Sequence, residues 1–331
     1  MGGSSGAAAG AGPAWTQGGD LGVGGEGEGT LDITGGAGVS NAVGRIGGRA
    51  GSSGTVNVAG GGSTWTNTGL LYVGDAGAGT LDISAGATVS SDDAQVGQAA
   101  NSSGTVTVRG PGSTWDIQGM PYIGVSGTGT VEVIEGALLR TEWGYIGHKA
   151  EGVGTVTVRG RNSEWSNGGS NIYVGNAGKG TLNVEQGGRV RVANVSIAEQ
   201  ANSVGNVRVH GTDADGNASE LRLYDLYVGN AGKGTLRIEG GGSVRSSNGT
   251  AGVNAGSEGR VTVSGAAANG QVSTWTTDKG SSLRIGDRGV GDLRIEAGGQ
   301  VASDSGVVGR SSGGVGNVTV AGVGSGAAAG T

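Results

Sequence analysis

The feature that most constrains this chain is a short pattern, Gly-Thr-Leu-Asp-Ile at residues 29–33, which returns in altered form eleven more times. Counted from the threonine position, the copies begin at Thr30, Thr55, Thr80, Thr105, Thr130, Thr155, Thr181, Asn206, Thr235, Arg260, Asp292 and Asn317. The first five steps are 25 residues each. A fixed period in this range is typical of stacked repeat proteins, in which each unit buries its apolar face against its neighbours.

The apolar residues of each unit predict short strands. Pairs such as Val106 and Val108 are two residues apart, which is the strand period and places both side chains on one face. The runs end in Gly, Asn or Ser, as short strands do. The helical spacing of apolar residues is not found. The sequence therefore predicts an all-β fold, a β-solenoid of about twelve coils with three short strands in each 25-residue coil.

Glycine content separates this fold from its alternatives. The chain has 331 residues, of which 79 are glycine, and no phenylalanine. Glycine does not fall at every third position, which excludes collagen, and the regular apolar pairs argue against disorder. A thin, tightly turning fold remains. We divide the chain into a Gly/Ala/Ser-rich N-terminal segment (1–14), a solenoid domain (15–323) and a Gly/Ala-rich C-terminal tail (324–331).

The tryptophans mark one phase of the repeat. Those at this phase are Trp15, Trp65, Trp115, Trp165 and Trp275, and Leu221 replaces tryptophan in one unit. Outward-facing rings would form an aromatic strip, whereas inward-facing rings would fill one corner of the core. Replacement by leucine favours the core. Trp143 lies off this phase and is predicted to be the exposed aromatic residue.

The residue between the two paired apolar residues of each unit is predicted to face outward. If the coils stack in order, these residues form one ladder: Asp32, Asn57, Asp82, Thr107, Glu132, Thr157, Asn183, Arg208, Arg237, Thr262, Arg294 and Thr319. The ladder is acidic toward the N-terminus and basic toward the C-terminus. Thr or Asn separates most of the like charges, which avoids repulsion between neighbouring strands.

Two motifs carry a family resemblance. Residues 104–115 contain Gly-Thr-Val-Thr-Val-x-Gly-x-Gly-Ser-Thr-Trp, and residues 71–83 contain Leu-Tyr-Val-Gly-x-x-Gly-x-Gly-Thr-Leu-x-Ile. They resemble the repeat associated with type V secretion (autotransporter) and PEP-CTERM proteins of Gram-negative bacteria, seen in autotransporter passenger regions. The resemblance covers roughly residues 15–323. It implies a right-handed parallel β-helix at the cell surface or in the extracellular medium, and it implies no activity.

Composition limits the classes of partner and site that we expect for this chain. The formal net charge is −6, and no basic face or run is present, so we expect no nucleic-acid partner. The absence of cysteine excludes disulfides and thiolate metal sites. The first residues lack the charged and apolar regions of a signal peptide. No apolar run approaches the roughly 20 residues of a membrane helix, so we expect no membrane insertion by this chain.

Late units contain extra residues, mainly at Gly211–Glu220 and Gly265–Ser273. Insertions in solenoids often lie on the binding face, although loops also tolerate insertion at little cost. Asp213, Asp215 and Asn217 could supply oxygen ligands to calcium, but the rest of an EF-hand loop is missing and a polar turn is favoured. We expect no cofactor. The candidate interaction surface comprises Trp143, Asp213, Asp215, Asn217, Asn269 and Gln271.

Three functions remain open. The first is a non-enzymatic extracellular structural or adhesive protein that contacts a surface glycan or a host or cell-surface protein. The second is a subunit that self-associates end to end into a filament. The third is a polysaccharide-acting β-helix enzyme, which would need clustered carboxylates or Lys/Arg bases in a groove. Three or more such side chains converging in a groove would favour the enzyme.

Overall fold

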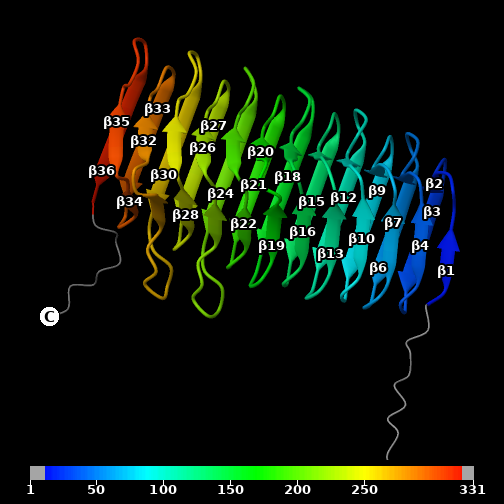
Figure 1. Cartoon of the computed structure of the whole chain (residues 1–331). Coiled ribbons are helices and arrows are strands. Elements are labelled where there is room, and N and C mark those ends of the chain that lie inside the picture. The colour runs from blue at the N-terminus through cyan, green and yellow to red at the C-terminus, as the bar shows by residue number, and fades with distance from the viewer. Residues whose placement is uncertain (1–11, 323–331) are drawn as a thin grey trace, which may run out of the picture.

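The computed structural model describes residues 12–322, and it confirms the all-β parallel β-solenoid. Twelve coils of three strands each build three parallel sheets of 12 strands, and the described residues contain no helix. Figure 1 shows the coils side by side in chain order, from the blue N-terminal coil to the red C-terminal coil. The segments 1–11 and 323–331, which hold most of the two terminal segments expected from the sequence, lie outside the described residues.

We call the three sheets A, B and C. The strands of sheet A are β1 (Ala14–Thr16), β4 (Gly38–Asn41), β7 (Thr64–Asn67), β10 (Thr88–Ser91), β13 (Thr114–Ile117), β16 (Leu138–Thr141), β19 (Glu164–Asn167), β22 (Arg189–Arg191), β25 (Glu220–Arg222), β28 (Ser243–Ser246), β31 (Thr274–Thr277) and β34 (Gln300–Ala302). The strands of sheet B are β2 (Leu21–Val23), β5 (Gly44–Ile46), β8 (Leu71–Val73), β11 (Ala94–Val96), β14 (Pro121–Ile123), β17 (Gly144–Ile146), β20 (Asn171–Val174), β23 (Asn194–Ile197), β26 (Asp225–Val228), β29 (Asn248–Ala251), β32 (Ser282–Ile285) and β35 (Ser305–Val308).

Sheet C contains the longest strands, of seven residues each. They are β3 (Glu28–Thr34), β6 (Ser53–Ala59), β9 (Ala78–Ser84), β12 (Ser103–Arg109), β15 (Thr128–Ile134), β18 (Val153–Arg159), β21 (Lys179–Glu185), β24 (Val204–His210), β27 (Lys233–Glu239), β30 (Glu258–Ser264), β33 (Val290–Glu296) and β36 (Val315–Ala321). Their register joins the repeat starts, Thr30 to Thr55 and onward. The outward ladder expected from Asp32 to Thr319 is present in that order.

The core confirms the inward assignment of the phased tryptophans. Trp65, Trp115, Trp165 and Trp275 are each at most 1% exposed. They alternate with smaller residues in sheet A, so that Trp65 pairs with Val39. Trp15, at the same phase, is 50% exposed because its strand β1 is at the end of the sheet and pairs only with β4.

Trp65, Trp165 and Trp275 each face a glycine across the core. A Cβ atom on Gly144 of sheet B would lie 2.7 Å from Cζ2 of Trp165, and one on Gly249 would lie 2.3 Å from Cζ2 of Trp275. In the unit where Leu221 replaces tryptophan, the corresponding residue of sheet B is Val195. The smaller side chain on one wall is thus offset by a larger one on the other, which keeps the interior filled.

The serine of the Ser-Thr-Trp motif joins successive coils. Ser63 Oγ donates to the carbonyl of Ala59 at 2.8 Å and accepts a hydrogen bond from the Gly36 amide of the preceding coil at 3.0 Å. Ser219 repeats the arrangement with His210 and Gly187. The motif therefore places a hydrogen-bonded serine at the corner between sheets C and A, two residues before the core-filling position.

The corner between sheets B and C is closed by glycine. The second residue of every strand in sheet C is glycine, and these glycines pair with one another along the sheet. A Cβ atom on Gly79 would lie 2.1 Å from the Gly74 nitrogen, and one on Gly154 would lie 2.2 Å from the Ile123 carbonyl oxygen. Only glycine allows two backbones to approach this closely.

Candidate binding surfaces

Sheet B presents a row of tyrosines, which we call the tyrosine strip: Tyr72, Tyr122, Tyr145, Tyr173 and Tyr227. Tyr122, Tyr145 and Tyr173 occupy consecutive coils, with ring centroids 5.0 Å apart and interplanar angles of 17° and 19°. This spacing is close to the strand separation of about 4.7–4.9 Å. The rings therefore form one continuous half-buried stack, and burial raises the pKa of Tyr122 and of Tyr145.

His148 packs against the edge of this stack. Its ring makes edge contacts with Tyr122 at 4.6 Å and Tyr145 at 5.3 Å between centroids. Nδ2 of Asn176 lies 3.1 Å from its Nδ1. Burial, and then the positive charge of Lys149, lowers the pKa of His148 below its ordinary value. Near neutral pH this imidazole is therefore uncharged and acts as part of the aromatic surface.

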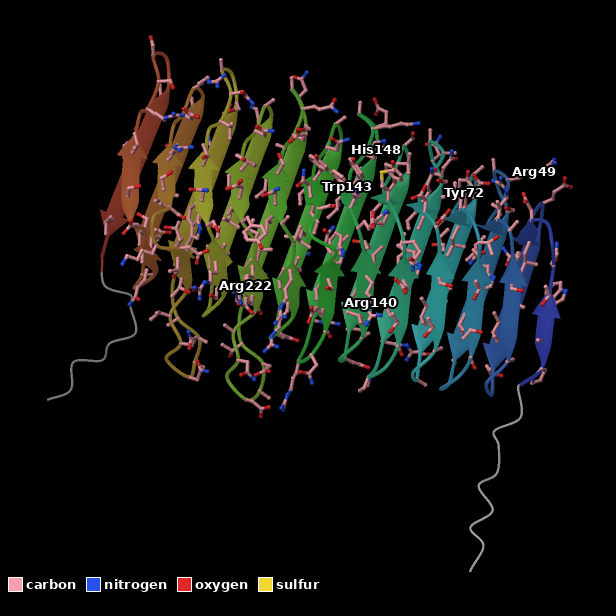
Figure 2. The ribbon with its side chains drawn as sticks, in the orientation of Figure 1. Arg49, Tyr72, Arg140, Trp143, His148 and Arg222 are labelled. Atoms are coloured by element: carbon pink, nitrogen blue, oxygen red, sulfur yellow. The ribbon has the colours of Figure 1, made fainter. Side chains whose placement is uncertain are left out.

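Sheet A presents a row of arginines, which we call the arginine strip: Arg140, Arg191, Arg222 and Arg245. Ser166 separates Arg140 from Arg191, and the other three pair in consecutive strands. Figure 2 labels Arg140 and Arg222, which lie on the same sheet in the lower half of the view. Arg245 forms an ion pair with Asp278 at 3.2 Å. Arg140, Arg191 and Arg222 form none within residues 12–322.

Sheet C carries a charged hollow of about 620 Å³ near the C-terminal end. Its charged lining residues are Arg237, Glu239, Arg260, Asp292, Arg294 and Glu296. This convergence meets the condition set from the sequence for an enzyme groove. Two of the carboxylates are already engaged, because Glu239 accepts from Arg208 at 3.1 Å and Asp292 accepts from Asn317 at 2.8 Å. All six side chains stand on the outer face of one sheet.

The two inserted segments are short hairpins at the corner between sheets C and A. One joins β24 to β25 through the bridge Thr212–Ala218, and the other joins β30 to β31 through Ala266–Val272. They project at the lower edge of Figure 1. A Cβ atom on Gly216 would lie 2.7 Å from Nδ2 of Asn269, so the two hairpins are in contact.

The side chains of the candidate calcium ligands already have partners within the protein. Asp213 Oδ1 accepts from the backbone amides of Asp215 and Asn217 at 3.0 and 2.8 Å, and Oδ2 accepts from the Asn217 side chain at 2.9 Å. Slight burial acts to raise the pKa of Asp213, but these hydrogen bonds outweigh it and the pKa is lowered. Asp215 forms an ion pair with Arg161. No group of three or more metal-ligating side chains occurs in residues 12–322.

The candidate interaction surface is brought together only in part. Asp213, Asp215, Asn217, Asn269 and Gln271 share the two touching hairpins, where Asn269 Oδ1 accepts from the Gln271 amide at 3.0 Å.

Trp143 lies elsewhere, at the corner between sheets A and B, in the two-residue connection from β16 to β17. The expectation that Trp143 is the exposed aromatic residue is only partly correct, because its side chain is half-buried, whereas Tyr224 is 67% exposed.

Sequence reasoning missed the arginine strip although the signal was present. Each of its members directly follows a core-facing residue of sheet A: Leu139, Val190, Leu221 and Val244. Because side chains alternate along a strand, the following residue must face outward. Aligning that one position across the coils would have revealed the strip.

Comparisons with known proteins give partial similarity. No family model matches the chain. An alignment of 161 residues is 33% identical to the "Uncharacterized lipoprotein YdeK" of Escherichia coli (strain K12), covering 44% of this chain and 11% of that protein. The chain thus matches about a tenth of the relative's length. A solved structure, the TibC-catalyzed hyper-glycosylated TibA55-350 fragment, is 18% identical over 93% of this chain and 97% of that fragment, with a TM-score of 0.28. The described residues contain no helix long and apolar enough to span a membrane.

Proposed function

We propose that this chain is a non-enzymatic structural and adhesive β-solenoid, similar to an autotransporter passenger, that presents a rigid surface to cells or matrix outside a Gram-negative bacterium. The stack of Tyr122, Tyr145 and Tyr173 is the observation that carries the proposal. Tyrosine is enriched at recognition surfaces because its apolar ring and hydroxyl contact a partner together. The partial similarity to a lipoprotein of Escherichia coli supports a location at the cell envelope.

Adhesion of coated beads tests this proposal. Beads carrying the full chain should be retained on cultured cells or extracellular matrix several-fold better than albumin-coated beads. Tyr145→Ser removes the centre of the stack and should reduce retention. Tyr227→Ser is the matched control, because Ser196 and Thr250 flank Tyr227 in the sheet and leave it without a stacked neighbour. Retention equal to that of albumin on every surface would contradict an adhesive role.

End-to-end association is the second candidate, and a specific observation favours it. In the last coil, Val308, Val318 and Val320 are 54%, 42% and 76% exposed, and Trp15 in the first coil is 50% exposed. Strands β34, β35 and β36 each have one unpaired edge, as do β1, β2 and β3. Open edges invite pairing, and a head-to-tail contact grows filaments. The competing explanation is that further coils of a longer array cover both ends.

Light scattering separates these explanations. A filament subunit should increase in mass with concentration at low salt, and Val320→Lys should keep it monomeric. A wild-type chain that stays monomeric throughout would eliminate the filament.

The enzyme alternative rests on the charged hollow of sheet C and is tested by incubation with a panel of polysaccharides. Release of reducing ends that is lost in Glu296→Gln would replace the non-enzymatic proposal.

A further inference from the structure

We propose that the arginine strip of sheet A, together with Tyr224, binds a short acidic oligosaccharide whose sugar rings carry carboxylate or sulfate groups. This inference rests on the adhesive function proposed above, and it names the ligand class and the face that binds it. The proposed site has arginine side chains without an ion-pair partner, an exposed aromatic ring and a limited length.

The charges of the strip are arranged unfavourably for the protein alone. Arg191, Arg222 and Arg245 face one another in adjacent strands of sheet A. Such strands are about 4.7–4.9 Å apart, and like charges directly opposite destabilise a sheet. Asp278 forms an ion pair with Arg245 at 3.2 Å. Hydrogen bonds from Ser247 and Arg245 lower the pKa of Asp278, and the nearby charge of Arg222 also helps to lower it without forming an ion pair. The guanidinium groups of Arg191 and Arg222 are in no ion pair within residues 12–322, and they remain available to an external anion in a chain whose net charge is −6.

The space above the strip suits a sugar ring. A cavity of about 320 Å³ is lined by Arg191, Arg222, Arg245 and Tyr224 among others, and by one carboxylate, that of Asp278, which is paired with Arg245. This is at the small end of the roughly 300–1,000 Å³ range of ligand pockets. The Tyr224 side chain is 67% exposed, so its ring is available to pack against the apolar face of a pyranose. Planar guanidinium groups then bind the carboxylate or sulfate groups through paired hydrogen bonds.

The ends of the strip limit the ligand. On the outer face of sheet A, Asp116 pairs with Arg140 at one end of the strip, and Thr276 pairs with Arg245 at the other end. The arginines therefore span five coils, or roughly 19 Å at the usual strand spacing. A short oligosaccharide fits this length. A nucleic acid would continue past Asp116 over the acidic body of the protein, which lacks the extended basic surface that nucleic-acid binding requires.

Isothermal titration of the full chain tests the proposal with two acidic probes, a galacturonate tetrasaccharide and a heparin-derived tetrasaccharide. At least one should bind, and the affinity should fall as salt rises, because salt screens the charges. Binding of the first alone would identify carboxylate as the recognised group, and binding of the second alone would identify sulfate. Maltotetraose, a neutral chain of the same length, should not bind detectably.

Two substitutions locate the site. Arg222→Gln should weaken binding about ten-fold, because it removes a charge-assisted hydrogen-bond donor. Arg159→Gln is the matched control, since Arg159 is also exposed and also forms no ion pair within residues 12–322, but lies on sheet C, away from the charged hollow. It should change the affinity less than about two-fold. Tyr224→Ser should weaken the binding of whichever acidic sugar binds the wild-type chain. It should leave the melting temperature unchanged, because Tyr224 is exposed.

Several results would overturn the inference: no binding of either acidic sugar, equal binding of maltotetraose, equal losses in Arg222→Gln and Arg159→Gln, or tighter binding of oligothymidylate or polyglutamate. If acidic sugars fail to bind while coated beads still adhere, this inference fails and the proposed function stands. If the sugars bind but the beads do not adhere, the adhesive function fails and the site remains.

Discussion

The same three residues, Val-Thr-Val, occur in β18 as Val156–Val158 and in β36 as Val318–Val320, with opposite environments. Val156 and Val158 are 0% exposed, whereas Val318 and Val320 are 42% and 76% exposed. Strand β18 pairs with β15 and β21, while β36 pairs only with β33. Burial in this protein is therefore supplied by the neighbouring coils, as expected when each repeat contacts only its neighbours.

The largest expected effect is the loss of stability caused by a charged substitution in an interior coil. Val158→Asp should destabilise the fold by about 4–7 kcal/mol, since burying a carboxyl group commonly shifts its pKa by 3–5 units. Val320→Asp, at the same position of the last strand, should have little effect because the carboxylate stays hydrated. Circular dichroism melts of both variants measure the contrast. Equal losses in the two variants would show that the last strand is as well covered as the middle one.

A second prediction compares two tryptophans of one phase. Trp165→Ala should cost about 3–5 kcal/mol, the usual range for a large aromatic removed from a core. Its indole also donates to Thr141 Oγ1 at 3.0 Å. Trp15→Ala should cost much less, because half of that side chain is already exposed. Urea unfolding of the two variants gives both values, and a costly Trp15→Ala would mean that another chain or segment covers the first coil.

A third prediction concerns pH in the interior coils. The pKa of His148 is lowered in the folded state, so the unfolded chain binds more protons. The contribution of His148 is complete above the unfolded pKa near 6.5 and is lost as pH falls toward the folded pKa. The melting temperature should therefore drop modestly between about pH 7.5 and 5.5. His148→Gln should remove this part of the drop, and an unchanged slope in that variant would assign the pH dependence to other groups.

The last prediction is that removing metal ions has no effect on the stability of the two hairpins. The hydrogen bonds that Asp213 accepts hold its hairpin without a metal, and the second hairpin has Ala267 at the corresponding place. EDTA should therefore leave the melting temperature unchanged. A large decrease that calcium reverses would establish a site at Asp213, Asp215 and Asn217 and would distinguish the two hairpins chemically.

The repeat made much of the fold predictable. A fixed period assigns each residue to a column, so the inward tryptophans and the outward ladder from Asp32 to Thr319 could be derived before any coordinates. The matched pairs Trp165–Gly144 and Leu221–Val195 could not, because they lie across the core rather than within one column.

The binding surfaces were harder to predict because they combine two unit types that alternate along the chain. One type has tryptophan, or Leu221 in its place, at the core-facing position of sheet A, and the other has a smaller aliphatic residue there. Tyr145 belongs to one type and Tyr122 and Tyr173 to the other, yet sheet B stacks all three. Arg222 and Arg245 are divided in the same way in sheet A. Reading each type separately hides both strips. The partial burial of Trp143 does not follow from residue spacing either, because Trp143 lies in the connection between β16 and β17, outside the strands whose side chains alternate.

The two kinds of corner differ in what they can accommodate. At the corner between sheets B and C the backbones are too close for any side chain, as Gly79 and Gly154 show. At the corner between sheets C and A, two hairpins are inserted. The first lies between β24 and β25, yet Gly205 of β24 still pairs with Gly234 of β27, so the register of sheet C is unchanged. New peptide sequence can therefore be grafted at one edge of the solenoid without shifting a single strand. The solenoid can in this respect serve as a display scaffold, because each corner along this edge is a position at which a loop can be inserted.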